Sequence, residues 1–222
     1  MSRPPAVAVM AKVPGAAAVK SRLHAALGAA QATALYRCFL LDRPQALSAV
    51  RAVCPVVAFT PPGARAAMAA LMPPAIPLLA QEGEGLSERL THVFDRLFAE
   101  GHEAVIATDS DSPTLPMDYV VQAAELLSRG KADTVVGPTD DGGYYLIGLR
   151  RPQPGLFDGI PWSTSGTRAA TLARARELGL GVQLLPGWFD VDTPDDLRRL
   201  RADLARCPTA PRTAEFLGTL AC

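Results

Sequence analysis

The sequence is short of the residues and motifs that identify several common classes of protein. Its 222 residues include only four cysteines and three histidines, and no two cysteines have C-x-x-C spacing. A zinc site and a disulfide framework are therefore not expected, and the cysteines are interpreted as reduced thiols of a cytoplasmic protein. The motifs G-x-S-x-G, H-E-x-x-H and G-x-G-x-x-G are also missing. Serine hydrolase, zinc protease and dinucleotide-binding functions thus lack their usual support.

Excess charge and long apolar runs are missing too. The chain has 22 basic and 22 acidic residues, so its formal net charge is zero. A nucleic-acid-binding protein usually has a basic face, so no nucleic-acid partner is expected. The apolar stretch near the N-terminus is only about five residues long, too short for a signal peptide or a membrane span. We expect a protein without membrane contact whose partners are small molecules.

Apolar strand patterns and amphipathic helix patterns alternate along the chain. They predict one α/β domain over residues 1–222, with a core over about 6–205 and a partly ordered C-terminal appendage over 206–222. The sheet is expected to be mostly parallel and covered by helices on both faces, which is a three-layer α/β/α sandwich. The expected strands are 6–10, 55–59, 76–80, 104–108, 133–137, 144–149 and 181–185. The expected helices are 29–42, one ending near 71, 86–100, 117–128, 164–178 and one beginning near 192.

Two segments of this pattern carry a specific expectation. The strand 144–149 leaves a tight turn, so it should be antiparallel or lie at the margin of the sheet. Pro44 should end or kink the first long helix, because proline has no amide hydrogen for the helical hydrogen bond.

Two carboxylates directly follow the strand 104–108. Asp109 and Asp111 are two residues apart, so in an extended segment they point to the same side, roughly 6 to 7 Å apart. Open parallel sheets bind ligands beyond the carboxyl ends of their strands, and two such carboxylates suit Mg²⁺ or Mn²⁺. The alternative is a solvated turn in which one aspartate caps the following helix.

The loop between the first strand and the first helix is basic. It contains Lys12, Gly15, Lys20 and Arg22, although the whole chain has only three lysines. Such a loop favours anions, and a lysine ammonium is a compact charge for phosphate oxygens. The loop is not a P-loop, because one glycine is missing and the spacing is one residue short. It is either a phosphate-binding loop or a basic surface loop.

Glycines mark a possible contact with a sugar or an acceptor. The turn Asp141-Gly142-Gly143-Tyr144 would let the backbone approach a ligand closely, and Tyr144 or Tyr145 could contact a ring. The alternative is a simple hairpin turn with core tyrosines.

Two further segments have a plain structural alternative. Asp190 and Asp192 repeat the D-x-D spacing and could complete a metal site, but Asp192 is also a good N-cap for the next helix. Trp162-Ser163-Thr164 is either an acceptor-side loop or a helix cap. None of the three histidines is assigned a role.

Taken together, these segments resemble one family. The motifs A-K-V-P-G-x₄-K-S-R-L, D-S-D-S-P-T-L-P, G-P-T-D-D-G-G-Y-Y-L-I-G-L, W-S-T and D-V-D-T-P-D-D-L occur in this order from about Val7 to Leu200. They resemble the uncharacterised transferases of the nucleotide-diphospho-sugar transferase superfamily, which are related to 2-phospho-lactate and molybdenum-cofactor guanylyltransferases. The resemblance implies the GT-A fold, a Rossmann-like three-layer sandwich, with a nucleotide over the N-terminal half and a divalent ion at the D-x-D.

The resemblance also implies roles for individual residues. It places the donor phosphates at Lys12, Lys20 and Arg22, the metal at Asp109 and Asp111, and a second metal contact at Asp192. Two departures leave the base open: Gly15 stands alone where cofactor guanylyltransferases have a glycine-rich segment, and Ser87 stands where relatives often have glycine.

The resulting hypothesis is an Mg²⁺- or Mn²⁺-dependent transferase that uses an activated nucleotide. Nucleotidyl transfer from a nucleoside triphosphate to a small acceptor is slightly preferred, and Lys20 and Asp111 are the expected catalytic residues. One alternative is glycosyl transfer from a nucleotide-diphospho-sugar, with the Asp141–Tyr144 turn on the sugar. The other is a nucleotide-binding protein without turnover. The acceptor, the base, the stereochemical course and the oligomeric state stay open.

Overall fold

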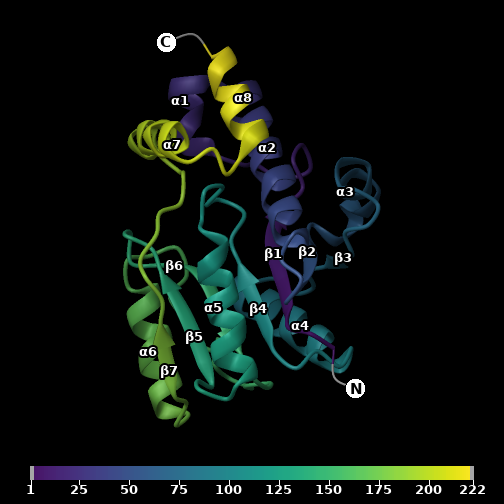
Figure 1. The fold of residues 1–222 in the computed structure, drawn as a ribbon, viewed down its shortest axis with the longest axis vertical. Helices are drawn as coiled ribbons and strands as arrows, with labels where there is room; N and C mark the ends of the chain where they lie inside the picture. The colour runs from purple at the N-terminus through teal and green to yellow at the C-terminus, as the bar shows by residue number, and fades with distance from the viewer. Residues whose placement is uncertain (1–2, 221–222) are drawn as a thin grey trace.

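Seven strands form one sheet in the order β3-β2-β1-β4-β6-β5-β7 in the computed structural model of the protein, which describes residues 3–220 (Figure 1). All neighbouring pairs are parallel except those of β6, which is antiparallel to both β4 and β5. The predicted antiparallel strand is therefore confirmed, but it lies inside the sheet. The strands are β1 (Ala6–Lys12), β2 (Cys54–Thr60), β3 (Leu78–Ala80), β4 (Val105–Thr108), β5 (Thr134–Pro138), β6 (Tyr144–Leu149) and β7 (Val182–Leu184).

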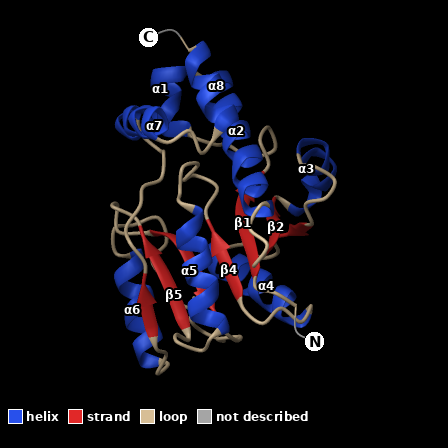
Figure 2. Cartoon of the chain, viewed as in Figure 1, coloured by secondary structure: helices blue, strands red, loops and turns tan. Residues whose placement is uncertain are grey.

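Helices cover both faces of this sheet (Figure 2). Helices α2 and α5 pack on one face and α4 and α6 on the other, so the predicted three-layer sandwich is confirmed. The helices are α1 (His24–Leu27), α2 (Ala29–Ser48), α3 (Arg65–Leu71), α4 (Leu86–Ala99), α5 (Met117–Ser128), α6 (Thr167–Glu177), α7 (Pro194–Arg206) and α8 (Pro211–Thr219), with short 3-10 helices at Ser21–Leu23 and Pro62–Ala64.

The sequence of β1 explains why it lies at the centre of the sheet. Successive side chains of a strand point to opposite faces, and Val7 and Val9 pack beneath α2 while Ala6 and Ala8 pack toward α4. All four are fully buried. A strand covered on both faces has a continuous apolar sequence rather than an alternating one, as this one has.

Helix α2 does not end at Pro44, where the sequence predicted an end or a kink, but continues to Ser48. The proline costs the helix one backbone hydrogen bond. Leu35, Phe39 and Leu47 of the same helix are fully buried, and burying each such side chain contributes roughly 1.5 to 3 kcal/mol. Packing therefore outweighs the local cost.

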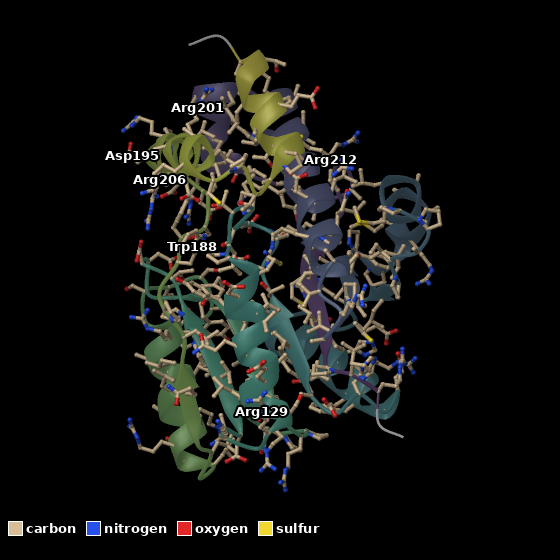
Figure 3. The ribbon with its side chains drawn as sticks, in the orientation of Figure 1. Arg129, Trp188, Asp195, Arg201, Arg206 and Arg212 are labelled. Carbon is tan, nitrogen blue, oxygen red and sulfur yellow. The ribbon has the colours of Figure 1, made fainter. Side chains whose placement is uncertain are left out.

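The C-terminal segment, expected to be a partly ordered appendage, forms helix α8, which packs against α2. Asp42 of α2 anchors it, although its carboxylate is almost fully buried. Its Oδ2 accepts hydrogen bonds from the amide and the hydroxyl of Thr213, at 2.9 and 2.8 Å. Its Oδ1 accepts from the amide and the guanidinium of Arg212, both at 3.3 Å. Arg212 lies where α8 begins, next to α2 (Figure 3).

This anchor predicts an effect on stability. Asp42→Ala should lower the free energy of unfolding by about 3 kcal/mol, because it leaves buried donors of α8 without an acceptor. Thermal and urea unfolding followed by circular dichroism would measure the change. Asp95→Ala is the control, because Asp95 is exposed on α4. If both variants unfold at the same midpoint, the anchoring role is wrong.

Candidate functional site

Two loops meet at the edge of the sheet where β1 and β4 end. The two strands are parallel neighbours, with Val9 opposite Thr108, so the segments after Lys12 and Thr108 leave the sheet at the same edge. This is the edge at which open parallel sheets bind ligands. The loop predicted to bind phosphate and the loop that carries the D-x-D therefore lie side by side.

Lys20 is the central side chain of this edge. Its backbone is left-handed, with φ 49°, just before the 3-10 helix, and its side chain is only 2% exposed. Its Nζ lies 2.6 Å from Asp111 Oδ1 and 2.9 Å from Asp192 Oδ1. The amide of Val191 donates to the carbonyl of Asp111 at 2.9 Å. Backbone and side chains thus tie the loop before α7 to the D-x-D loop.

The electrostatics of this cluster favour charged groups. Burial alone would lower the pKa of Lys20, but the attraction of Asp111 and Asp192 outweighs burial and raises this pKa above its ordinary value. Burial would raise the pKa of Asp192, yet Lys20, with Arg22 and Lys12 farther away, holds it below its ordinary value. Arg22 Nη1 lies 3.5 Å from Asp192 Oδ2. Lys20 and Asp192 are therefore ionised at neutral pH.

A cavity of about 310 Å³, the first cavity, opens beside this cluster. Its volume is in the range of small-ligand sites. Three cationic side chains and two carboxylates line it, so it offers both phosphate-binding charges and oxygen ligands. Gly15 lies in the same loop with φ 89° but is not part of the wall. The lining residues are Met10, Lys12, Ala18, Val19, Lys20, Ser21, Arg22, Tyr36, Ser110, Asp111, Ser163 and Asp192.

Tyr36 of α2 supports the first cavity from below. Its hydroxyl oxygen accepts a hydrogen bond from the amide of Lys12 at 3.0 Å and lies 2.9 Å from Ser110 Oγ. Burial and the nearby Asp111 raise the pKa of Tyr36 above its ordinary value, so the phenol stays protonated. Sequence reasoning missed this residue, because in the helix pattern it is one apolar position among many.

Asp109 is separated from the other predicted metal ligands. Its Oδ2 accepts a hydrogen bond from Ser112 Oγ at 2.7 Å, while its Oδ1 is buried and has no hydrogen-bond partner. Burial, with the repulsion of Asp111, raises the pKa of Asp109 to about 7. The carboxyl group lines a second cavity and not the first.

A buried arginine that the sequence did not reveal lies behind the D-x-D. Arg43 of α2 is fully buried and donates to the carbonyl of Leu115 at 3.3 Å and to Thr108 Oγ1 at 3.4 Å. Burial lowers its pKa to about 10, against the attraction of Asp109. The guanidinium thus places a positive charge beneath Asp109.

The second cavity, of about 200 Å³, adjoins the first, because Met10 and Ser163 line both. Its wall is mostly apolar and aromatic. Tyr144 and Trp162 meet edge to face in it, with ring centroids 6.2 Å apart. The remaining lining residues are Leu86, Leu90, Ala107, Thr108, Asp109, Asp141, Gly143, Tyr145, Leu146, Ile147, Thr164 and Thr167.

The turn 141–144 borders the second cavity as a rigid element. Asp141 Oδ1 accepts hydrogen bonds from Thr139 Oγ1 at 2.6 Å and from the amide of Gly143 at 2.9 Å. Gly142 has φ 91°, and a Cβ there would overlap the backbone of Ser165. Glycine at 142 is therefore required by both conformation and space.

This requirement predicts a measurable cost. Gly142→Ala should lower the free energy of unfolding more than Gly159→Ala, by at least about 1 kcal/mol, because both positions have positive φ but only the first lacks room for a Cβ. Thermal unfolding of the two variants measures the difference. Equal losses would show that the turn can shift away from Ser165 without cost.

The carboxylates at the sheet edge fit a divalent ion only in part. Asp111 and Asp192 each place an oxygen within 2.9 Å of one point, which Lys20 Nζ occupies, and one or two carboxylates with water and phosphates suffice for Mg²⁺. Within residues 3–220, no group of three or more acidic, cysteine or histidine side chains is placed to hold a metal. Asp190 lies nearby, with a pKa raised to about 6 by burial and by Asp192.

Asp192 was alternatively predicted to be the N-cap of the next helix, and this alternative is wrong because its neighbour Thr193 is the N-cap. Thr193 is the N-cap of α7, and its hydroxyl and the side chain of Asp196 form a capping box. The carboxylate of Asp192 is left for Lys20 and Arg22. The loop 162–164 does not cap α6 in the usual way, because Gly166 is the N-cap and has no side chain to do so. Thr164 Oγ1 instead accepts from the amide of Gly166 at 3.2 Å, and all three loop residues line the second cavity. The acceptor-side role of the loop stays a prediction.

Comparison with known proteins identifies relatives of the chain. Residues 44–164, slightly more than half of the chain, match the family described as "Uncharacterized protein conserved in bacteria (DUF2064)". No curated protein matches the chain. No helix within the described residues is long and apolar enough to cross a bilayer.

Solved structures support the fold. A protein of Desulfovibrio desulfuricans G20 named "putative nucleotide-diphospho-sugar transferase" is 32% identical over 96% of this chain and 94% of its own, with a TM-score of 0.89. The 4-diphosphocytidyl-2C-methyl-D-erythritol synthase of Anaerococcus prevotii DSM 20548 is 10% identical over 90% and 96%, with a TM-score of 0.60.

A CMP:2-keto-3-deoxy-manno-octonic acid synthetase solved with CTP is 16% identical over 92% of this chain and 99% of its own, with a TM-score of 0.54. At this identity the last two structures bear on the fold alone. The chain thus has the nucleotide-diphospho-sugar transferase fold, as the resemblance implied. The specific relation to guanylyltransferases does not follow from these comparisons and stays a prediction.

Proposed function

The chain belongs to the DUF2064 family, and from this premise and the first cavity we propose that it is a transferase that uses an activated nucleotide. Nucleotidyl transfer from a nucleoside triphosphate to a small acceptor is the preferred reaction. The solved relative that is 32% identical is named as a nucleotide-diphospho-sugar transferase, which supports the general class.

One observation carries the proposal. Lys12, Lys20 and Arg22 line one cavity together with Asp111 and Asp192 at the carboxyl edge of a parallel sheet. Fixed cations of this kind stabilise charge that develops on a departing phosphate group. An ordinary surface loop would not bury Lys20 to 2% exposure between two carboxylates.

The proposed step is a displacement at the α-phosphorus of the triphosphate. An acceptor oxygen forms the new bond to phosphorus, the bond to the bridging oxygen breaks, and pyrophosphate leaves with that electron pair. If the acceptor is a hydroxyl, its proton passes to water. Lys12, Lys20 and Arg22 bind the departing phosphates, so the protein contributes mainly position and charge.

Asp111 and Asp192 would hold Mg²⁺ or Mn²⁺, which bind through carboxylate oxygens, water and substrate phosphates. Such an ion, when bound, neutralises phosphate charge and orients the triphosphate. Asp109 stays a predicted ligand from its place in the D-x-D, although its carboxyl group faces the second cavity. A donor in the first cavity and an acceptor in the second would then meet where the two cavities join.

Glycosyl transfer from a nucleotide-diphospho-sugar is the second candidate. The observation that favours it is the second cavity, where the 141–144 turn and two aromatic rings could face a sugar. The products separate the two reactions: pyrophosphate leaves in nucleotidyl transfer, and a nucleoside diphosphate leaves in glycosyl transfer. A non-catalytic nucleotide-binding protein would bind a donor and release neither.

Ligand-induced stabilisation tests the proposal. Thermal unfolding is measured with each nucleoside triphosphate and each nucleotide-diphospho-sugar, with and without Mg²⁺. A donor at about 100 times its dissociation constant should add roughly 2.7 kcal/mol to the folded state, a shift of several degrees for a domain of this size. A shift with one triphosphate supports nucleotidyl transfer, and a shift with a nucleotide-sugar alone supports the second candidate. No shift with any donor would contradict a donor site in the first cavity.

A further inference from the structure

We propose that the second cavity binds an acceptor that is an uncharged, hydroxyl-bearing ring, and that it rejects a phosphorylated one. The proposal rests on the proposed function in so far as it takes the first cavity for the donor. The proposal goes beyond the proposed function by assigning the chemical class of the acceptor. Four features of the cavity support it: its charge, its aromatic wall, an unpaired carboxyl oxygen and its junction with the first cavity.

The two cavities differ in charge: basic side chains among the described residues line the first cavity but not the second. Within the described part of the chain, no lysine, arginine or histidine lines the second cavity, whereas two carboxyl groups, those of Asp109 and Asp141, do. Arg168 directly follows Thr167, a lining residue at the start of α6. Its guanidinium is held outside the lining, where Nη1 donates to the carbonyl of Thr139 at 3.0 Å. The buried Arg43 lies behind Asp109 and is not part of the wall, so a phosphate group placed here would face two carboxyl groups without a cation in the cavity lining, which opposes binding.

The aromatic wall is held in a fixed orientation. Trp162 Nε1 donates to Ser87 Oγ at 2.8 Å, and Ser87 Oγ donates to the carbonyl of Phe157 at 2.5 Å. The polar atom of the indole is therefore satisfied inside the protein. Tyr144 packs against the same indole edge to face. Flat apolar surfaces of this kind suit a ring with an apolar face.

Ser87 has a structural role, because its hydroxyl oxygen accepts the hydrogen bond from the indole of Trp162. The family resemblance placed glycine at its position, and glycine has no hydroxyl to accept the indole hydrogen. Serine in this chain therefore fixes the orientation of Trp162. One of the two departures of this chain from the family pattern thus falls on the residue that holds Trp162 of the second cavity in place.

An unpaired oxygen supplies the polar contact. Asp109 Oδ1 is buried without a hydrogen-bond partner, while Oδ2 is held by Ser112 Oγ. A buried acceptor without a partner costs stability until a donor binds to it. In the ionised carboxylate this oxygen is an acceptor, so a hydroxyl of the ligand can satisfy it by donating a hydrogen bond. A phosphate that is ionised at neutral pH offers mainly acceptors and does not supply this donor.

The junction of the cavities gives the ligand access to the donor. Met10 and Ser163 line both cavities, so a ring in the second cavity can extend one hydroxyl toward phosphates in the first. That hydroxyl oxygen would form the new bond to the transferred group as the bond to the leaving pyrophosphate or nucleoside diphosphate breaks, and its proton would pass to water.

The test uses a fluorescent reporter that the chain already contains. The sequence has two tryptophans, Trp162 and Trp188. Trp188 lies below α7 (Figure 3) and is not part of the second cavity. Trp188→Phe keeps an aromatic ring against Phe189 and leaves Trp162 as the single reporter. With a donor analogue bound, its emission is titrated with matched probes: glucose and glucose 6-phosphate, inositol and inositol 1-phosphate, phenol and phenyl phosphate.

The neutral member of at least one pair should bind at least about tenfold more tightly than its phosphate ester. Preference for glucose or inositol identifies a saccharide-like acceptor, and preference for phenol identifies an aromatic one. Equal or tighter binding of the phosphate esters overturns the proposal. So does the lack of a saturable response to every neutral probe up to about 10 mM.

A variant that changes the charge of the second cavity tests the charge argument directly. Thr164→Arg adds a cation at an exposed position of the lining and should shift the preference toward the phosphate esters by about tenfold. An unchanged preference would contradict the charge argument. Donor binding, measured on the same variants by thermal unfolding, keeps the two questions separate. If no donor binds, the proposed function fails; if a donor binds and the esters are preferred, only the acceptor class fails.

Discussion

Lys20→Met is expected to lower turnover by about 10²- to 10³-fold, because it removes the only cation that is buried against both Asp111 and Asp192 among the described residues. Donor binding should weaken as well. The two carboxylates would then face each other without their shared counter-ion. Some stability should be lost, but both side chains are about one-third exposed, so water screens part of the repulsion.

The measurement is steady-state turnover with the donor identified by thermal shift, together with urea unfolding of the same preparation. Lys131→Met is the matched control, because Lys131 is exposed in the turn before β5. Lys20→Arg should not restore activity, since the larger planar guanidinium does not fit where a compact ammonium is buried. If the turnover of Lys20→Met stays within about twofold of that of the unmodified protein, the transition state has lost almost no stabilisation. Lys20 would then have no part in the mechanism.

Asp111→Asn should abolish metal-dependent turnover, with a loss of about 10²-fold or more, while the chain still folds. The amide keeps the size of the side chain but replaces a charged oxygen ligand. Lys20 keeps its contact with Asp192, so the loop before α7 should stay in place. Binding of Mn²⁺, followed by electron paramagnetic resonance, gives a readout that does not depend on turnover and should weaken in parallel.

Asp118→Asn is the control for this substitution, because Asp118 is exposed in the first turn of α5. Removing metal from the unmodified protein with a chelator should mimic Asp111→Asn and have little further effect on that variant. If Asp111→Asn binds Mn²⁺ normally and keeps its turnover, Asp111 has no part in holding the ion. The double variant with Lys20→Met should lose less than the sum of the two single losses, since both residues belong to one ion cluster.

Most of the fold could be predicted because local patterns and burial agree. The strand Val105–Thr108 and the helix Met117–Ser128 occur within one residue of their predicted bounds. One of the two outcomes predicted at Pro44, the end of the helix, does not occur, because burial of the surrounding helix outweighs one lost hydrogen bond. Helix α8 was missed for a related reason, because its anchor, Asp42, is 170 residues away along the chain.

The sequence by itself determined the parts of the site that follow from spacing. It placed Asp109 and Asp111 after a buried strand and Lys12, Lys20 and Arg22 in the loop after another, and parallel strands bring such ends to one edge of a sheet. It could not show that Lys20 is buried between two carboxylates, or that Asp109 faces a different cavity.

The tertiary structure alone decided which of these residues act on one another, because direction and burial depend on contacts between segments far apart in the chain. Lys20 and Asp192 are 172 residues apart and share a hydrogen bond of 2.9 Å. Arg43 and Tyr36 occupy apolar-looking helix positions, yet both face the D-x-D from below. Composition and periodicity carry no information about such pairings, since a buried charge is stable only where a distant segment supplies its partner.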